Sequence, residues 1–201
     1  HYLHRHLDWL KEKDCFAAGP ALGAYQHQEL TAVLVCPPEG AGTAWIRLLA
    51  ARRHVHLAST FKQLWQAAIP LLTDSGIHTA AVMALAEWIA PVLVDAGFSV
   101  LDDVIFYEQD LPALLPHKIH NGIRTFNPED LSSIQTVDQL AFSSIWQHAP
   151  ESLEAAVHKG SYITVHESDG SILGYQISTQ SAFGAHLARL AVLPEAQNQG
   201  I

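Results

Sequence analysis

Basic residues, cysteines and long apolar runs are all scarce in this sequence. Its 201 residues include 11 Lys and Arg against 20 Asp and Glu, for a formal net charge of -9. Nucleic-acid binding needs clustered basic side chains, so this balance argues against a nucleic-acid partner. The only two cysteines, Cys15 and Cys36, form neither a metal-ligand pattern nor a disulfide framework, and we therefore expect a reducing cytoplasm. No stretch approaches the ~20 apolar residues of a membrane helix, and no basic start precedes an apolar run, so we expect neither a membrane partner nor a signal peptide.

Histidine, in contrast, is abundant, with 13 residues. His1, His4 and His6, and again His54 and His56, invite a metal interpretation, because His-x-His spacing puts both rings on one side of a strand. No Cys or carboxylate ligands follow at metal-site spacing, so we expect no metal site.

Apolar periodicity and breaker residues predict an α/β chain. In the first half we expect strands over Thr31–Val35, Ala44–Ala51, Thr79–Leu85 and Val100–Tyr107, and helices from Thr60 and over Trp88–Ala96. Thr60 and Gln63 have capping-box spacing, and Pro70 is expected to end or kink the first of these helices. Gly97 is expected to stop the second.

The second half follows a proline-rich segment, Asp110–Asn121, which we interpret as a linker. Asn127 and Pro128 are a strong helix start, and the apolar stripe of that helix would be Leu131, Ile134, Val137, Leu140 and Ala141. The expected strands are Gly122–Phe126, then Tyr162–Glu167 and Ser171–Gln180 joined by a hairpin at Ser168-Asp169-Gly170, and finally Ala185–Val192.

The segment after this last strand has the character of an anion site. A strand that leads through polar residues and glycine toward a helix start presents backbone N–H groups to a phosphate, and glycine lets the backbone approach closely. Gln197-Asn-Gln-Gly-Ile201 is such a segment.

In detail, this segment resembles the acetyl-CoA pyrophosphate-binding segment of GNAT-type N-acetyltransferases. The family pattern is a strand ending in an apolar-Ala-Val run, a Pro two residues later, and then Gln/Arg-x-x-Gly-x-Gly/Ala. Leu190-Ala191-Val192, Pro194 and Gln197 to Ile201 fill it in register, with the second glycine falling at position 202. The resemblance implies that Leu190, Ala191 and Val192 bind the pantetheine arm, and that Gln197, Asn198, Gln199, Gly200 and Ile201 bind the pyrophosphate of acetyl-CoA.

The resemblance extends over two copies of one fold. It implies an α/β (α+β) fold of the acyl-CoA N-acyltransferase type, with a mixed, mostly antiparallel central sheet flanked by helices. Residues 117–201 would be the N-terminal half of an acetyltransferase domain. Residues 1–116 would be a degenerate copy, incomplete at its N-terminus, because the aligned loop His56–Thr60 contains no glycine and would crowd a pyrophosphate. Ala44–Ala51 and Ala185–Val192 form a weak internal repeat in matching contexts.

The implied reaction is transfer of an acetyl group from acetyl-CoA to a primary amine on a small molecule, peptide or protein. A base must remove a proton from the amine, and His186 stands where one branch of the family has a glutamate base. A solvated or hydrogen-bonded His186 is the alternative, and no tyrosine occupies the position of the family's general acid. A non-catalytic CoA-binding or scaffolding module is the alternative function, a chance match of the loop is a third possibility, and the resemblance also allows a homodimer.

Overall fold

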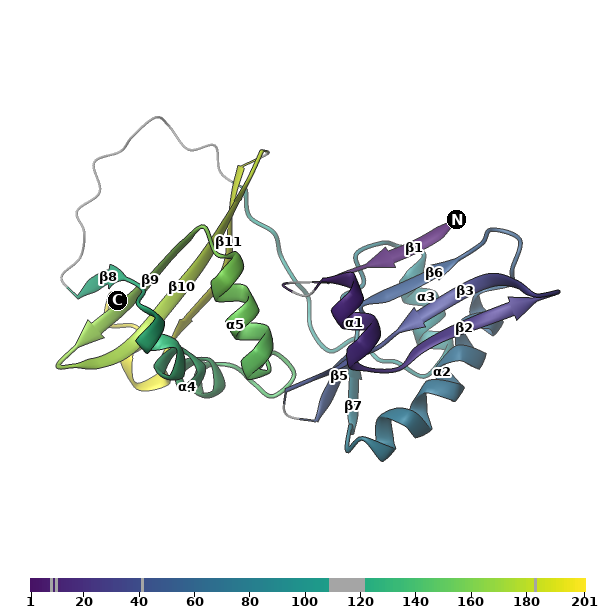
Figure 1. Cartoon of the computed structure of the whole chain (residues 1–201), viewed down its shortest axis with the longest axis horizontal. Helices are drawn as coiled ribbons and strands as arrows, with labels where there is room; N and C mark the ends of the chain where they lie inside the picture. Colours follow the sequence, from purple (N-terminus) through teal and green to yellow (C-terminus); the bar gives the residue numbers. More distant parts are fainter. Residues whose placement is uncertain (8, 10, 41, 109–121, 183) are drawn as a thin grey trace.

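Two α/β lobes make up the described structure (Figure 1). The computed structural model describes residues 1–7, 9, 11–40, 42–108, 122–182 and 184–201. We name residues 1–108 the first lobe and residues 122–201 the second lobe. The predicted linker Asp110–Asn121 and the predicted domain boundary at 116/117 lie outside the described residues.

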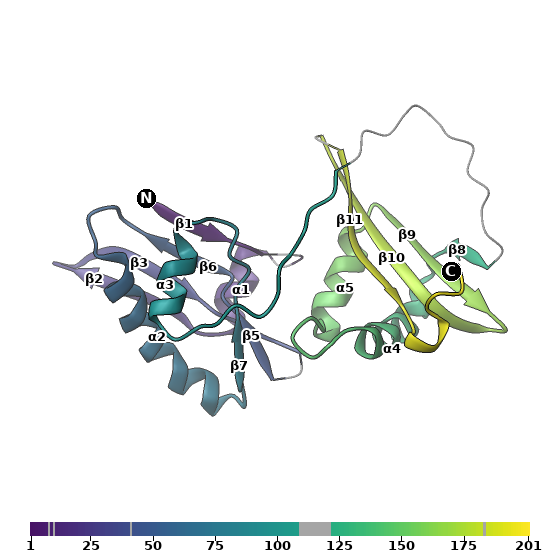
Figure 2. The ribbon, with the colours of Figure 1, turned by 180° about the vertical axis from the view of Figure 1, so that it is seen from behind.

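The first lobe has a larger antiparallel sheet and a smaller mixed one. The larger sheet has the order β1-β6-β3-β2, and the smaller has the order β4-β5-β7, in which β5 and β7 run parallel. The strands are β1 (Tyr2–Arg5), β2 (Ala21–Gln26), β3 (Glu29–Val35), β4 (Pro38–Glu39), β5 (Thr43–Trp45), β6 (Leu48–Ala51) and β7 (Thr79–Ala81). The helices are α1 (Glu12–Ala18), α2 (Leu57–Asp74) and α3 (Ile89–Asp95), with α2 and α3 on one face of the larger sheet and α1 on the other (Figures 1 and 2).

The core of the first lobe lies between helix α2 and strands β2 and β3. Phe61, Leu64, Ala68 and Leu72 are buried along one face of α2, at the three- and four-residue spacing of a helix that covers a sheet. Pro70 lies on the exposed side, where the helix carries on to Asp74. Water can satisfy the carbonyl that Pro70 leaves unpaired, so the predicted early end does not occur.

The predicted strand Ala44–Ala51 is divided between the two sheets. β5 pairs with β7, and β6 pairs with β3 and β1. Between them, the Ile46 N–H donates to Ala81 O (2.8 Å) and the Arg47 N–H donates to Val35 O (2.9 Å). The chain therefore changes pairing partners at these two residues.

The second lobe is a meander with two helices on one face. Its sheet order β11-β10-β9-β8 is antiparallel throughout, and α4 and α5 contact each other and β10. The strands are β8 (Ile123–Thr125), β9 (Tyr162–Ser168), β10 (Ser171–Ser181) and β11 (Gly184–Val192); the helices are α4 (Leu131–Ala141) and α5 (Pro150–Lys159), with short 3-10 turns η1 (Pro128–Asp130) and η2 (Pro194–Ala196). The predicted hairpin is confirmed, with Asp169 and Gly170 both at positive φ, as a two-residue type I′ turn requires.

The start of α4 is fixed as the sequence predicted. Asn127 and Asp130 form a reciprocal capping box, and Pro128 is the first residue of η1. Arg124 of β8 donates hydrogen bonds from both terminal nitrogens to the Asp130 carboxylate (2.7 and 2.8 Å) and from Nε to Glu167 of β9 (2.6 Å). Hydrogen bonds from Arg124, only partly opposed by burial, hold the pKa of Asp130 below its usual range. These contacts join the helix start to the sheet.

Several predicted boundaries are wrong for identifiable reasons. Helix α2 begins at Leu57 rather than Thr60, because His56 caps it: the His56 ring accepts a hydrogen bond from the Ser59 N–H (3.4 Å). The strand expected over Thr79–Leu85 ends at Ala81. Val100–Tyr107 has strand-forming residues, but no strand of the described residues pairs with it, and its large apolar side chains are exposed.

Two further differences concern burial and turns. Leu140, predicted in the stripe of α4, is exposed, whereas Ile134 and Val137 are buried as predicted. The β2–β3 hairpin went unrecognised because its two turn residues, His27 and Gln28, take positive φ without the glycine or asparagine that normally signals such a turn.

We predict that Phe61→Ala lowers the free energy of unfolding by about 3–5 kcal/mol, because it leaves a cavity under α2. Chemical denaturation measures the change. Phe106→Ala is the matched control, since Phe106 is 74% exposed and should change stability by less than about 0.5 kcal/mol. Equal effects of the two substitutions would contradict this description of the core.

Candidate functional site

Strand β11 forms an edge of its sheet, and one row of its backbone groups faces outward. The Leu193 N–H donates to Leu173 O of β10 (2.8 Å). Backbone groups alternate along an antiparallel strand, so those of Ala191 also face β10, while those of Leu190 and Val192 face the open edge. Ala191 is buried in the core, and the Leu190 side chain is 56% exposed. The strand thus offers peptide groups to an extended ligand along its edge.

The loop after β11 continues this edge with a left-handed turn. Asn198 and Gly200 have φ of +61° and +81°, and in the part of the chain that the structure describes the N–H groups of Asn198 to Ile201 donate no hydrogen bond. The Gln197 side chain donates to Val192 O (3.0 Å), and the Gln199 side chain donates to Glu195 O (2.8 Å). These two amides shape the loop, while consecutive backbone N–H groups are left for an anion.

A β-bulge interrupts β11 just before this edge. Ile177 of β10 pairs with Arg189, but the next residue, Ser178, pairs with Leu187, so Ala188 is left without a partner in the ladder. An unpaired residue of this kind bends the strand and turns its peptide groups out of the sheet.

The aligned edge in the first lobe is covered by other residues. Leu49, Ala50 and Ala51 of β6 correspond in the repeat to Leu190, Ala191 and Val192, and β1 pairs antiparallel with them through Tyr2, Leu3 and His4. In the aligned loop His56 caps α2, with its ring and its carbonyl oxygen accepting from the N–H groups of Ser59 (3.4 Å) and Thr60 (3.0 Å). Both the edge and the helix start are therefore occupied by protein.

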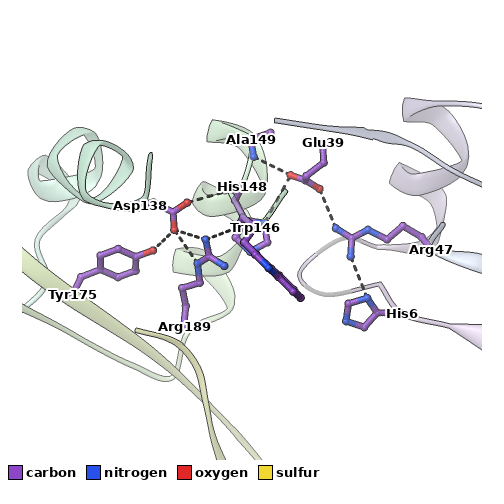
Figure 3. Close-up of polar contacts among 9 residues, drawn as sticks. All are labelled: His6, Glu39, Arg47, Asp138, Trp146, His148, Ala149, Tyr175 and Arg189. Carbon is purple, nitrogen blue, oxygen red and sulfur yellow. Dashed lines mark hydrogen bonds and ion pairs between the residues drawn. The ribbon is translucent and has the colours of Figure 1, made fainter. Parts of the chain in front are cut away.

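A buried carboxylate connects the two lobes (Figure 3). Glu39 accepts from Arg47 (3.0 Å) in the first lobe and from the Ala149 N–H (2.9 Å) in the second, and both charged side chains are 2% exposed. His148 Nδ1 lies 3.8 Å from the Glu39 carboxylate, at ion-pair rather than hydrogen-bond distance. A side chain at Gly40 would meet the backbone of His148 and Ala149 at 3.2–3.3 Å, so the two lobes would have to move apart by a few tenths of an ångström.

Burial alone would raise the pKa of Glu39. The contacts with His148, Ser152, the Ala149 N–H and Arg47 outweigh it and lower this pKa to about 2. Glu39 is therefore a fixed negative charge at neutral pH.

A second buried carboxylate, Asp138 of α4, positions the strand with the bulge. It accepts from Arg189 of β11 (2.8 Å), from the hydroxyl of Tyr175 and from the His148 N–H (3.3 Å). Arg189 also donates to Trp146 O (2.7 Å), and its guanidinium lies 3.6 Å from the centre of the Phe142 ring. Burial and the Asp138 charge raise the pKa of Tyr175 well above its usual range, so the phenol remains protonated.

The junction between the lobes contains a partly open cavity of about 150 Å³. Trp45 and Trp146 pack against each other in its wall, with ring centres 5.4 Å apart, and Arg47 lies over Trp45. The cavity is lined from both lobes by His6, Trp9, Trp45, Arg47, Met83, Ile145, Trp146, Gln147, His148, Ala188 and Arg189. The unpaired residue of the bulge thus faces a small aromatic and basic chamber.

The sequence-predicted residues fall into two groups. Leu190 to Val192 and Gln197 to Ile201 lie together along one edge and loop, as the motif implies, although what they bind stays a prediction. His186 lies beyond the bulge, paired with Thr179 on the exposed part of the β10–β11 hairpin, and it does not line the cavity. Its role as a base stays a prediction.

Sequence reasoning missed the junction residues. No motif distinguishes Glu39 and Asp138 from the other acidic residues of the sequence. Glu39 also contacts Ala149, which is 110 positions away in the sequence. Trp45 belongs to no motif, and its residue type alone indicates no more than a core or groove-lining aromatic. Gly40 is a local signal, because glycine lets another backbone approach closely.

Comparisons with solved structures place this fold. A GCN5-related N-acetyltransferase from Sphaerobacter thermophilus is similar over 86% of this chain and 60% of its own, with 15% identity and a TM-score of 0.53. A tandem GNAT protein from the clavulanic acid biosynthesis pathway matches 88% of this chain and 64% of its own, at 16% identity and TM-score 0.48. N-myristoyltransferase from Saccharomyces cerevisiae with bound myristoyl-CoA matches 88% and 51%, at 17% identity and TM-score 0.47.

The expected fold class, mixed and mostly antiparallel sheets flanked by helices as in acyl-CoA N-acyltransferases, is confirmed. The chain spans less than two thirds of the length of each of these three structures. No protein-family profile and no curated protein sequence matches it. Among the described residues, no helix is long and apolar enough to cross a membrane.

We predict that Glu39 makes stability depend on pH in an acidic window. Its pKa is lowered on folding from 4.5 to about 2, so its stabilising contribution is complete above about pH 4.5 and is lost as pH falls through about 2. The contribution of Glu39 to the free energy of unfolding should be on the order of 3 kcal/mol. In Glu39→Gln, the free energy of unfolding should lack this change with pH. Urea denaturation from pH 2 to 6 measures it. Glu29→Gln is the control, because Glu29 pairs with Arg52 at an exposed site and should leave the profile nearly unchanged.

Proposed function

We propose that the protein is an acyltransferase that moves an acetyl group from acetyl-CoA to a primary amine, at the second lobe, in the cytoplasm. The observation that carries this proposal is the continuous strip of outward-facing peptide groups along β11 and the left-handed loop after it. It coincides with the residues that match the CoA-binding motif, on a fold shared with a GCN5-related N-acetyltransferase.

The strip divides into two parts with different chemistry. Leu190 and Val192 would hold the pantetheine arm, a chain of amides, by strand-like hydrogen bonds to their backbone. The N–H groups from Asn198 to Ile201 would bind the pyrophosphate, where Gly200 keeps side-chain atoms away. Gln197 holds the loop to Val192, and Ala191 anchors the strand in the core.

The bulge at Ala188 suits the reacting end of the thioester. Attack by the amine turns the thioester carbonyl into an oxyanion, which backbone N–H groups stabilise when they already point toward it. The Ala188 peptide lies just before the Leu190–Val192 edge, and its place in the ladder is unpaired. The acceptor amine must lose a proton before or during attack, for which His186 is the candidate from the sequence.

We further propose that the first lobe is a copy that no longer binds CoA. Strand β1 fills the edge that pantetheine would use, and the His56 cap consumes N–H groups that a pyrophosphate would need. Its contribution is to the junction, where Trp45 and Arg47 form part of the cavity wall next to Ala188.

We predict that Gly200→Val weakens acetyl-CoA binding by about tenfold or more, because a β-branched residue is strained at φ +81° and brings atoms over the N–H groups. Calorimetry measures the dissociation constant. Gly170→Val is the matched control: Gly170 has φ +76° and equally open surroundings, but it lies in the β9–β10 turn. A similar loss of affinity in both variants would refute the assignment of the loop.

The function itself is tested with the full chain, acetyl-CoA and a panel of small amines, amino sugars and peptides, by following release of the CoA thiol. Amine-dependent release is expected. Tight CoA binding without release on any acceptor would favour the scaffolding alternative, and absence of CoA binding would mean that the loop match is accidental. Longer acyl-CoA thioesters in the same assay determine whether acetyl is the preferred group.

A further inference from the structure

His148 touches both lobes and lines the cavity beside the bulge. It precedes α5, its side chain is 12% exposed, and it lines the same cavity as Ala188. Its Nδ1 is buried without a hydrogen-bond partner among the described residues and lies on the Glu39 side. The imidazole is thus nearly buried, and its Nδ1 atom makes no hydrogen bond to the described residues.

The backbone on each side of His148 is fixed. Its own N–H donates to Asp138 (3.3 Å), and the next N–H, of Ala149, donates to Glu39 (2.9 Å). The backbone at His148 therefore cannot leave the junction without breaking contacts to buried carboxylates in both lobes.

The charges around this ring are largely balanced. Glu39 and Arg47 face it from the first lobe as an ion pair, and Asp138 and Arg189 form a second pair in its own lobe. His6, whose Nδ1 lies 3.3 Å from Arg47, is the remaining titratable group of the cavity wall.

Accordingly, and resting on the proposed function, we propose that His148 is the base that takes the proton from the acceptor amine, with Glu39 of the first lobe as its positioning residue. A cavity of about 150 Å³ holds roughly one benzene-sized group. An amine nitrogen inside it would lie beside Ala188 and His148, which both line the cavity. Its volume suits a slim amine end, such as a primary alkyl or arylalkyl amine.

The proton balance is complete without a further reactant. The ammonium gives one proton to the imidazole, and the neutral nitrogen attacks the thioester carbon to form the C–N bond. The carbonyl electron pair moves to oxygen beside the bulge, and on collapse the C–S bond breaks. The departing thiolate takes the second proton from nitrogen, leaving amide, CoA thiol and a protonated imidazole that returns its proton to solvent.

The test compares kcat/KM across pH 5.5–9 in the full chain, with the best amine from the panel. His148→Ala should lower kcat/KM by about 10²–10³-fold and should remove the rise of kcat/KM with pH on the acidic side of the profile. The acetyl-CoA dissociation constant should stay within about twofold of the wild-type value. Added imidazole should restore part of the rate, at least about fivefold, which a purely structural role for the ring would not allow. His148→Gln keeps the bulk without a base, and replaces the alanine variant if that one unfolds.

Two other histidines serve as comparison. His158→Ala, on the exposed side of α5, should leave the rate and the profile unchanged. His186→Ala tests the rival base on the exposed hairpin. The proposal is overturned if the His148 variants keep the rate within about threefold, if imidazole gives no rescue, or if His186→Ala removes the acidic limb instead. Wild-type chain that turns over no amine would overturn the proposed function as well, whereas turnover that ignores His148 would overturn this assignment alone.

Discussion

The buried ion pair between Glu39 and Arg47 is the constraint on which the arrangement of the two lobes depends. Arg47 stands where the strand changes from one sheet of the first lobe to the other, and Glu39 reaches from the same lobe to the Ala149 N–H. Burying two charges is costly unless each has a partner in good geometry, so separating the lobes would leave the carboxylate short of a donor. The second carboxylate, Asp138, repeats this principle inside the second lobe, where it ties Arg189 and the bulge to α4. Directional hydrogen bonds to Glu39 from Arg47 and Ala149 therefore link the two lobes in this placement.

Local features of the fold were predictable from the sequence, and features that depend on distant partners were not. The α4 start, with Asn127 and Pro128, and the Asp169-Gly170 hairpin require only a few neighbouring residues, and both are confirmed. The single strand expected over Ala44–Ala51 is in fact divided between two sheets. Its first part, β5, pairs with β7, and its second part, β6, pairs with β3 and β1. Val100–Tyr107 has strand propensity but no pairing partner among the described residues.

The same distinction applies to the candidate site. The strip along β11 and the loop to Ile201 is contiguous in sequence, so a motif could mark it. The cavity beside Ala188 draws on His6, Trp45 and His148, which only the packing of the lobes brings together. No spacing rule connects residues so far apart, and a single sequence contains no record of which residues vary together. The base inferred from the motif, His186, and the base inferred from the structure, His148, differ for this reason.

The strand β1 also has a consequence for the order in which the chain folds. In the second lobe, β9, β10 and β11 pair through short turns, which close at small entropic cost, whereas β8 pairs with β9 across a long connection that contains α4 and α5. In the first lobe, β2 and β3 form a hairpin, and Tyr2 pairs with Ala51 from beyond it. Contacts between distant positions slow folding, so we expect the β1–β6 pairing to form after the hairpins, although β1 comes first in the chain. The edge of β6 would then stay open for part of that time, exposed to any other strand able to pair with it, until the N-terminal residues close it.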